Sequence, residues 1–458
     1  MKDWNGKRVL VLGAARQGLA LARWLSLHGA RVTLSDIRPA EELRVARESL
    51  AEFSIHWALG GHPLELLDSA DVLCLSGGVP LALPIVVEAV KRGIPLSNDT
   101  QIFMEVVPCK TIGITGSAGK TTTTTLVGQM ARNVHGKKAY VGGNIGDPLI
   151  NHVDHMDRDN IAVLEISSFQ LDQMTISPNV AAILNITPNH LDRHGTMESY
   201  IASKGRILEF QSKEDAAILG RDDHGAWNLR NKVKGKLFTF SLNELEQGLD
   251  GTYLHEGLLN LRDGNLYLPL ILREKILLRG DHNVSNVLAA CAIGYAAGFT
   301  LDAMLEAVAG FRGVPHRLEL VRELRGVHWY NDSIATAPER SMAAIRSFDE
   351  PLVLMLGGRD KNLPWDDLAQ LIARRVDHVV LFGEAAEKIA ETLRRLGQDE
   401  QRFTISRADH LRDAVLQAAE VAEAGDVVLL SPGGTSFDEF KDFAERGERF
   451  RAWVQELS

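Results

Sequence analysis

The feature that most constrains the fold of this chain is a repeated pattern: a short apolar run, a glycine-rich turn and a helical segment. Residues 8–13 are almost continuously apolar, as expected of a strand that is buried on both faces. Units of this kind build parallel sheets, which bind ligands at the carboxyl ends of their strands. We therefore predict an α/β fold with strands near 8–13, 31–35, 72–75, 111–115, 161–164, 180–184, 327–330, 352–356, 378–382 and 426–430.

The length of the chain predicts several domains, because 458 residues exceed what one hydrophobic core organises. The pattern of strands and glycine turns restarts near residue 109 and again after His316. We place three domains at 1–108, 109–313 and 314–458. A polar, turn-rich stretch at 232–279 is typical of small β structure, and an alanine-rich helix is expected at 283–298.

Composition excludes several classes of protein. No apolar run reaches the ~18 residues of a membrane span, so we expect no membrane insertion. The chain carries 50 Lys and Arg against 60 Asp and Glu, a net charge of -10, which argues against a nucleic-acid binder. Its three cysteines have no metal-ligand spacing, and the N-terminus has no signal-peptide pattern, so we expect a cytoplasmic protein.

The sharpest local motif is TGSAGKTT at 115–122, which follows a predicted strand and opens a helix. Such glycines let the backbone wrap an anion, and the helix N-terminus points free N–H groups at it. Lys120 would reach the β- and γ-phosphates, and the Thr121 hydroxyl would bind Mg²⁺. The match is imperfect, because Ile114 stands where the motif has glycine and Gly113 is one residue too early. A glycine turn without a nucleotide is the alternative.

The first glycine turn is a weaker signal for a dinucleotide. Gly13 and Gly18 lack the middle glycine of the fingerprint, where Ala15 stands. Asp36 could accept from a ribose hydroxyl, and nearby arginines would suit a diphosphate. A nicotinamide site and a plain tight turn both remain open from these residues alone.

Three further side chains are candidates for a magnesium-phosphate site. Glu165 ends a predicted strand, where a hard oxygen ligand for Mg²⁺ is expected, although a strand-terminal Glu is often merely solvated. His190 follows the next strand, so it can face the same crevice, although a lone histidine is more often structural. Taken by itself, Lys204 is expected to be an ordinary lysine on a helix surface.

The chain resembles a known family, the Mur ligases, which are ATP-dependent amide-bond ligases of peptidoglycan precursor synthesis. The resemblance spans essentially the whole chain. It implies three domains: a Rossmann-like UDP-binding domain, a central phosphate-loop ATPase domain and a C-terminal Rossmann-like domain. The segments that carry it are TGSAGKTT (115–122), GGNIG (142–146), EISSFQLD (165–172), NITPNHLDRH (185–194), SKGRI (203–207), GDHNVSN (280–286), PHR (315–317), NDSIAT (331–336), GGRDK (357–361) and LSPGGTSFDEF (430–440).

The resemblance implies roles for residues in the central and third domains. It implies two Mg²⁺ ions, with Lys204 carbamylated so that the lysine carries a carboxylate, and it places Asn144 near the reacting carboxyl. The implied metal ligands are Thr121, Glu165, His190 and Lys204, and the implied catalytic residues are Lys120, Glu165, His190, Lys204 and Asn144. The implied ATP-binding residues are Gly116, Ser117, Ala118, Gly119, Lys120, Thr121, Thr122, Asn283, Asn286, Arg317 and Asp332.

The resemblance also implies two substrate sites and removes the need for a nicotinamide cofactor. Residues matching the UDP-substrate site are Arg16, Asp36, Arg38, Ser76 and Gly78, and those matching the glutamate site are Thr336, Lys361, Ser436 and Phe443.

The implied activity is that of the glutamate-adding branch of the family. ATP would activate UDP-N-acetylmuramoyl-L-alanine as an acyl phosphate, which the amine of D-glutamate then attacks, and we expect the protein to act as a monomer. Ile334 stands where this branch usually carries Lys, which leaves L-glutamate open as the substrate. The rival functions are a phosphate-loop NTPase without ligase activity and a catalytically idle module that binds UDP-sugars.

Overall fold

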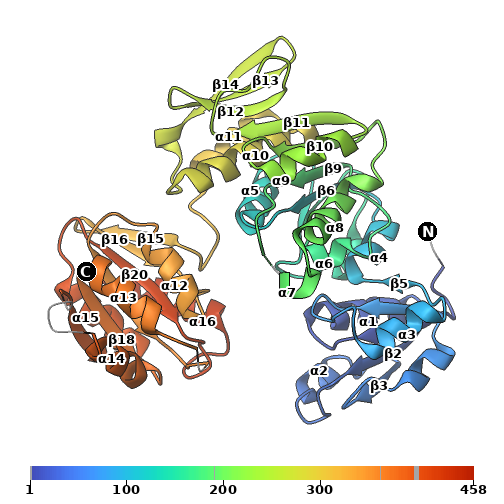
Figure 1. The fold of residues 1–458 in the computed structure, drawn as a ribbon, viewed down its shortest axis with the longest axis horizontal. Helices are drawn as coiled ribbons and strands as arrows, with labels where there is room; N and C mark the ends of the chain where they lie inside the picture. The colour runs from blue at the N-terminus through green and yellow to red at the C-terminus, as the bar shows by residue number, and fades with distance from the viewer. Residues whose placement is uncertain (1–2, 190, 362, 397–401) are drawn as a thin grey trace. The chain divides into compact units, whose positions relative to one another are not determined.

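The computed structural model describes residues 3–189, 191–361, 363–396 and 402–458. The strands of these residues form three sheets of five, nine and six strands (Figure 1). By its contacts the chain divides into two compact units. The first contains the residues up to Ile276 together with Asp281–Phe311, and the second contains Leu277–Gly280 and Arg312–Ser458. The domain boundaries at 108 and 313 stay predictions.

The first sheet is parallel throughout and has the strand order β3-β2-β1-β4-β5. Its order reverses beside β1, so the turns after β1 and β4 flank the crevice where such sheets bind ligands. Its elements are β1 (Arg8–Leu12), α1 (Arg16–Leu27), β2 (Arg31–Asp36), α2 (Arg44–Ser49), β3 (Ile55–Leu59), β4 (Val72–Leu75), α3 (Pro84–Lys91), β5 (Leu96–Ser97) and α4 (Asp99–Val106).

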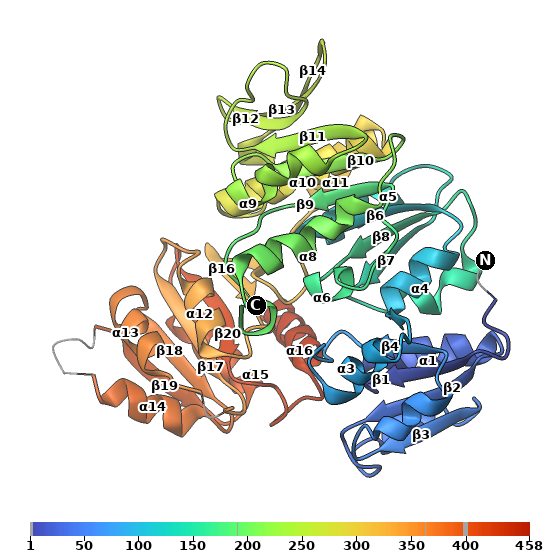
Figure 2. The ribbon, with the colours of Figure 1, turned by 45° about the vertical axis from the view of Figure 1, so that its right-hand side comes forward.

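The second sheet has the order β14-β13-β12-β11-β10-β9-β6-β8-β7 and is parallel from β7 to β12 (Figure 2). The stretch at 232–279, predicted as small β structure, contains β11–β14, which extend this same sheet. The pairings of β11 with β10 and β12 are parallel, and those of β13 with β12 and β14 are antiparallel. The strands are β6 (Lys110–Thr115), β7 (Ala139–Gly143), β8 (Ile161–Glu165), β9 (Val180–Ile183), β10 (Ala216–Gly220), β11 (Lys236–Ser241), β12 (Gly251–His255), β13 (Leu258–Asp263) and β14 (Leu266–Leu272).

Two groups of helices accompany the second sheet. One group consists of α5, α10 and α11, which pack on one another, and the other includes α6 and α8, which also pack together. The helices are α5 (Lys120–Arg132), α6 (Ser168–Leu171), α7 (Leu191–His194), α8 (Met197–Glu209), α9 (His224–Trp227), α10 (Asp281–Ala297) and α11 (Leu301–Gly310).

The third sheet has the order β15-β16-β20-β17-β18-β19, and only the β15–β16 pair is antiparallel. Its core is apolar on both faces, as the continuous apolar runs predict. Its elements are β15 (Glu319–Leu324), β16 (Val327–Asn331), α12 (Pro338–Ile345), β17 (Leu352–Gly357), α13 (Asp366–Arg375), β18 (His378–Phe382), α14 (Ala386–Arg394), β19 (Thr404–Ala408), α15 (Leu411–Val421), β20 (Val427–Gly433) and α16 (Phe443–Glu456).

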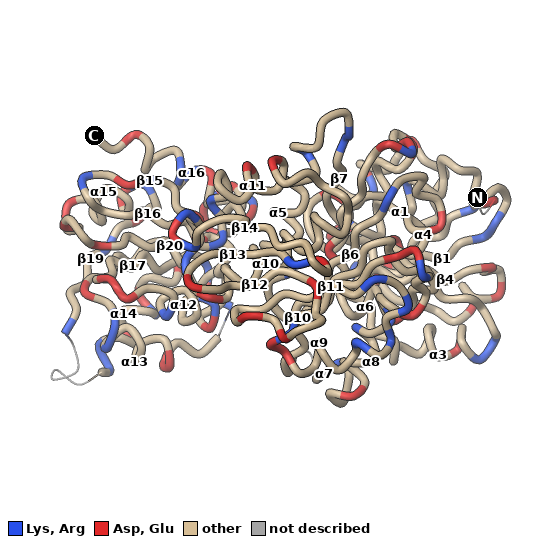
Figure 3. Tube along the Cα trace, turned by 90° about the horizontal axis from the view of Figure 1, so that it is seen from above, with Lys and Arg blue, Asp and Glu red and all other residues tan. Residues whose placement is uncertain are grey.

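Charged residues of both signs are interspersed along the whole chain (Figure 3). Among the residues that the structure describes, no helix is both long enough and apolar enough to span a bilayer.

The two residues that break the glycine spacing of the phosphate motif belong to the core of the second sheet. Ile114 is fully buried in β6. Gly113 lies one residue earlier, and a Cβ atom built on it would lie 2.3 Å from Cγ of Pro178. Gly113 is therefore required by packing against the Pro178 ring, not by a phosphate.

We expect Gly113→Ala to lower the free energy of unfolding by ~1–3 kcal/mol, because the added methyl group overpacks a rigid site. Chemical denaturation measures this. Gly310→Ala is the matched control, because a Cβ there meets nothing closer than the Gln129 amide nitrogen at 3.9 Å. A Gly113→Ala protein as stable as the wild type would contradict the packing assignment.

Candidate active site

The phosphate motif forms a loop between β6 and α5. Gly119 is the N-cap of α5 and has a φ of 81°, a conformation that favours glycine. The Lys120 amine folds back over the loop and donates to the carbonyl oxygens of Gly116, at 2.7 Å, and Ser117, at 3.2 Å. The predicted strand, loop and helix are all present, with the helix N-terminus at the loop.

The loop is braced by residues that follow β9, which sequence analysis did not single out. The Asn185 amide makes a two-point contact with Ala118: Oδ1 accepts from the backbone N–H at 2.8 Å, and Nδ2 donates to the carbonyl at 3.2 Å. The Ser117 hydroxyl bonds the backbone of Thr187 and lies 3.1 Å from the Tyr200 hydroxyl. Asn185 belongs to the quoted segment NITPNHLDRH, but nothing in that segment indicates the contact.

Glu165 ends β8 beside the loop and is buried. Its Oε2 accepts from the Thr121 hydroxyl at 2.8 Å, and its Oε1 accepts from the Asn144 amide at 2.9 Å. The backbone N–H of Asn144 also donates to the Glu165 carbonyl, at 2.8 Å. Three residues predicted from separate segments thus form one cluster of oxygen-bearing side chains.

Lys204 lies on α8 and is only 1% exposed, which contradicts its reading as an ordinary surface lysine. Its amine donates to the Gly116 carbonyl at 2.9 Å and lies 4.7 Å from the centre of the Tyr200 ring. Burial, together with the charge of Lys120, lowers the pKa of Lys204 to about 7.

Two amines, those of Lys120 and Lys204, therefore converge on the one carbonyl oxygen of Gly116. The two positive charges lie close together at this carbonyl and form a site suited to an anion. A phosphate, or a negative charge placed on Lys204 itself, would complement it.

The predicted metal ligand His190 lies outside the described residues. Within the described ranges no three His, Cys, Asp or Glu side chains cluster as a metal site. The oxygen atoms of Glu165 and Thr121 nevertheless suit Mg²⁺, which is usually bound by few protein oxygens, substrate phosphates and water.

The two predicted adenine-side asparagines lie one turn apart on α10. The Asn286 amide donates to Asn283 Oδ1 at 3.1 Å. Asn286 also lies against the phosphate loop, because a Cβ on Gly119 would be 2.3 Å from its Oδ1. The glycine thus permits the close approach of α10, while Thr122 lies partly buried in the first turn of α5.

In the first domain Asp36 and Arg38 form one hydrogen-bonded unit. Asp36 accepts from the Arg38 guanidinium at 2.8 and 2.9 Å and from the backbone N–H of Ala14 at 2.7 Å. The bonds from Arg38 hold the pKa of Asp36 well below its usual range. Arg16 reaches the second sheet, where it donates to the Asn144 carbonyl at 3.3 Å.

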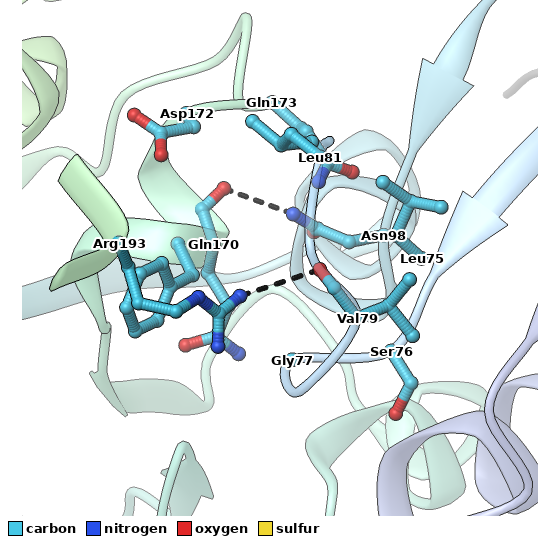
Figure 4. Close-up of a pocket in the computed structure, with 11 residues that line it drawn as sticks. Leu75, Ser76, Gly77, Val79, Leu81, Asn98, Gln170, Asp172, Gln173 and Arg193 are labelled. Atoms are coloured by element: carbon cyan, nitrogen blue, oxygen red, sulfur yellow. Dashed lines mark hydrogen bonds between the residues drawn. The ribbon is translucent and has the colours of Figure 1, made fainter. Parts of the chain in front are cut away.

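A pocket lies between the turn after β4 and the segment around α6 (Figure 4). The Asn98 amide donates to the Gln170 carbonyl at 2.9 Å, and Arg193 donates to the Val79 carbonyl at 3.4 Å. Predicted Ser76 lines the pocket, whereas predicted Gly78 is exposed beside it. The remaining lining residues, which include Leu75, Gly77, Leu81, Phe169, Asp172 and Gln173, were not predicted.

The second unit holds Asp332 at the end of β16, where it is 5% exposed. Its carboxylate accepts from the Ser431 hydroxyl at 2.8 Å and from the backbone N–H of Leu318 at 3.2 Å. Burial raises the pKa of Asp332 to about 7, although the charge of exposed Arg317 opposes the rise.

The residues predicted for glutamate come from four loops or helix starts of this unit. Ser436 is buried after β20, Thr336 is partly buried after β16, Lys361 is exposed after β17, and Phe443 begins α16. The carbonyl of Ile334, at the position where lysine is usual, accepts from the Arg340 guanidinium at 3.3 Å.

Comparison with known families covers most of the chain. The description "Mur ligase MurD-like, N-terminal domain" matches residues 7–98, "Mur ligase middle domain" matches 114–294, and "Mur ligase, glutamate ligase domain" matches 316–434.

Two curated relatives match almost end to end, and both are named UDP-N-acetylmuramoylalanine--D-glutamate ligase. The protein of Symbiobacterium thermophilum is 40% identical over 99% of this chain and 98% of its own length. The protein of Acidobacterium capsulatum is 42% identical over 99% and 97%.

Solved structures share the fold at lower identity. UDP-N-acetylmuramate-alanine ligase MurC from Thermotoga maritima aligns with a TM-score of 0.56 and 20% identity, over 98% of this chain and 99% of the other. MurF from Acinetobacter baumannii aligns with a TM-score of 0.57 and 17% identity, over 99% and 94%.

The brace on the phosphate loop generates a prediction. Asn185→Ala removes both contacts to Ala118, so the loop must be ordered by the ligand, and we expect the Kd of a non-hydrolysable ATP analogue to rise about tenfold. Isothermal calorimetry measures this. Asn260→Ala, which removes one amide bond on β13 to the Leu258 carbonyl, is the control. Equal affinity in both variants would mean that the loop needs no brace.

Proposed function

We propose that this chain, which belongs to the Mur ligase family, adds D-glutamate to UDP-N-acetylmuramoyl-L-alanine. The reaction would consume ATP and serve peptidoglycan precursor synthesis. The observation that carries the ligase chemistry is the cluster of Lys120, Thr121, Glu165 and Lys204 at one edge of the second sheet. The choice of D-glutamate rests on the names of the two relatives that match nearly the whole chain.

In this proposal the loop at 116–122 holds the ATP phosphates, with Lys120 turned from the loop carbonyls onto the γ-phosphate. Glu165 and Thr121 would hold one Mg²⁺, and His190 with carbamylated Lys204 would hold a second. Bound Mg²⁺ offsets the repulsion between the phosphates and the reacting carboxylate. Asn144, which is bonded to Glu165, would orient the carboxyl group of the muramoyl-alanine substrate.

The proposed reaction has two steps. An oxygen of the alanine carboxylate attacks the γ-phosphorus, and the bond from phosphorus to the β–γ bridging oxygen breaks. ADP departs as the leaving group, and the substrate becomes an acyl phosphate. The glutamate amine then attacks the acyl carbon and loses a proton, and the bond to the phosphate oxygen breaks. The residues of this chain contribute positioning and electrostatic stabilisation rather than covalent chemistry.

We assign the substrates by unit. Arg16, Asp36, Arg38, Ser76 and Gly78 would bind the UDP-substrate, Asn283 and Asn286 the adenine side of ATP, and Arg317 and Asp332 the γ-phosphate and ribose. Thr336, Lys361, Ser436 and Phe443 would hold glutamate. Arg340 supports this assignment, because it brings a cation to the loop where Ile334 replaces the usual lysine. The cytoplasmic location and the monomeric state stay predictions.

The direct test is phosphate release from ATP with UDP-N-acetylmuramoyl-L-alanine and either enantiomer of glutamate. We expect release with D-glutamate to exceed release with L-glutamate by orders of magnitude, because fixing both carboxylates aims only one amine at the acyl carbon. Lys120→Ala should reduce the rate at least ~100-fold. Phosphate release that does not depend on glutamate would favour an NTPase. A preference for L-glutamate would overturn the substrate assignment.

The lowered pKa of Lys204 generates a second prediction. A carbamate forms from CO₂ and the neutral amine, and the neutral fraction rises with pH through a pKa of about 7. After acid treatment removes the carbamate, the rate of reactivation at a fixed concentration of dissolved CO₂ should rise between about pH 6 and about pH 8.

Lys204→Ala is the control for this experiment. It should show almost no activity and no response to CO₂, while short carboxylic acids restore part of the activity. A fully active enzyme whose electron density shows a bare ammonium group on Lys204 would contradict the carbamate.

A further inference from the structure

Arg446 is the largest fully buried charged side chain of the described residues, and the mechanism above does not use it. It lies on α16, and its guanidinium donates only to uncharged oxygens. Nε bonds the Ser333 hydroxyl at 3.0 Å, and Nη2 bonds the Ser333 carbonyl at 2.9 Å. Nη1 and Nη2 both bond the Gly434 carbonyl, at 3.1 Å. A single planar group thus joins three segments of the second unit.

These segments carry the residues assigned to glutamate. Ser333 lies three residues before Thr336, and Gly434 lies two residues before Ser436. The Ser333 hydroxyl in turn donates to the carbonyl of Phe443 at 2.8 Å. The position of three of the four proposed glutamate residues therefore depends on one guanidinium.

The fourth glutamate residue is linked to the same network through the backbone. Arg359, two residues before Lys361, exchanges two backbone hydrogen bonds with Thr435, at 2.8 and 2.9 Å. A Cβ on Gly358 would lie 2.8 Å from Nη1 of Arg446, so the loop after β17 also packs on the guanidinium.

The charge of Arg446 is not neutralised by contact. No carboxylate of the described residues lies within ion-pair distance of it, and the charges of Asp438 and Glu439 act on it only at longer range. Burial lowers the pKa of Arg446 to about 10, so the group stays charged at neutral pH. A buried cation without an ion pair is a costly way to stabilise a fold, and it favours a nearby anion.

We propose that Arg446 is the positioning residue of the glutamate site: it fixes the loops after β16 and β20 and the start of α16 in one geometry, and its charge favours a dicarboxylate there. This inference rests on the proposed function. Arg446 acts through Thr336, Ser436 and Phe443 and does not itself touch the substrate.

The test compares Arg446→Lys, Arg446→Met and wild type by the KM values for D-glutamate, ATP and the UDP-substrate, and by the ratio of D- to L-glutamate turnover. Arg446→Lys keeps the charge but loses the planar fork, so we expect the KM for D-glutamate to rise about tenfold and the enantiomer ratio to fall. The other two KM values should stay within about threefold. Arg446→Met should raise the KM for D-glutamate further.

Arg451→Lys is the matched control, because Arg451 lies on the same helix and is paired with Glu319 at 2.8 Å. It should leave the KM for D-glutamate unchanged. If the Arg446 variants do not fold, Ser333→Ala carries the test, because it removes the acceptor of Arg446 Nε and the bond to Phe443 while the guanidinium stays in place. It should raise the KM for D-glutamate about threefold.

Two outcomes separate this inference from the proposed function. A wild-type protein without glutamate-dependent phosphate release would refute the function itself. Glutamate-dependent release in the wild type, combined with an unchanged KM for D-glutamate in the folded Arg446 variants or in Ser333→Ala, would refute only the positioning role.

Discussion

The arrangement of the candidate active site depends on the parallel register of four strands in the second sheet. Ile114 of β6 lies opposite Glu165 of β8, which lies opposite Gly143 of β7, and Thr115 pairs with Ile183 of β9. Parallel strands end at the same edge, so this register brings the phosphate loop and the residues after each neighbouring strand together. Without this register, Thr121, Asn144 and Asn185 would not lie at the same edge of the sheet.

The same edge concentrates positive charge in a buried place. Lys204 is held there by the packing of α8, where its amine competes with that of Lys120 for a single carbonyl. Such an arrangement is unfavourable for the isolated protein, because Lys204 is desolvated and its charge is repelled by that of Lys120. It becomes favourable when phosphates arrive or when Lys204 becomes an anion. The site is thus organised for its ligands at some cost to the unliganded fold.

Much of this could be predicted from sequence, because the informative patterns are local. Continuous apolar runs predicted strands in each of the three sheets, and the motif at 115–122 predicted the strand, loop and helix of the phosphate site. The strands β3, β5, β7, β10, β15 and β19 were not predicted. The roles of Gly113 and Ile114 were not predicted, because their constraint comes from Pro178 and the sheet core rather than from the motif.

Long-range contacts explain the other omissions. The Asn185 amide bonds Ala118, which lies 67 residues earlier in the chain, and Arg446 bonds Ser333, which lies 113 residues earlier. No local sequence pattern indicates either contact. The local sequence predicted an exposed Lys204, because the neighbouring residues of its helix are polar. Its burial results from tertiary packing, which the local sequence does not show. The stretch at 232–279 was predicted as β structure, but its union with the second sheet depends on the pairing of β11 with β10.

The central claim is that this site transfers phosphate to a carboxylate before the amide bond forms. The most direct measurement uses UDP-N-acetylmuramoyl-L-alanine labelled with ¹⁸O in the alanine carboxylate, together with ATP and D-glutamate, and determines the mass of the phosphate released. The account predicts that phosphate gains a single labelled oxygen for each amide formed, because the carboxylate oxygen leaves with it. Unlabelled phosphate, released by attack of water on ATP, would contradict the account.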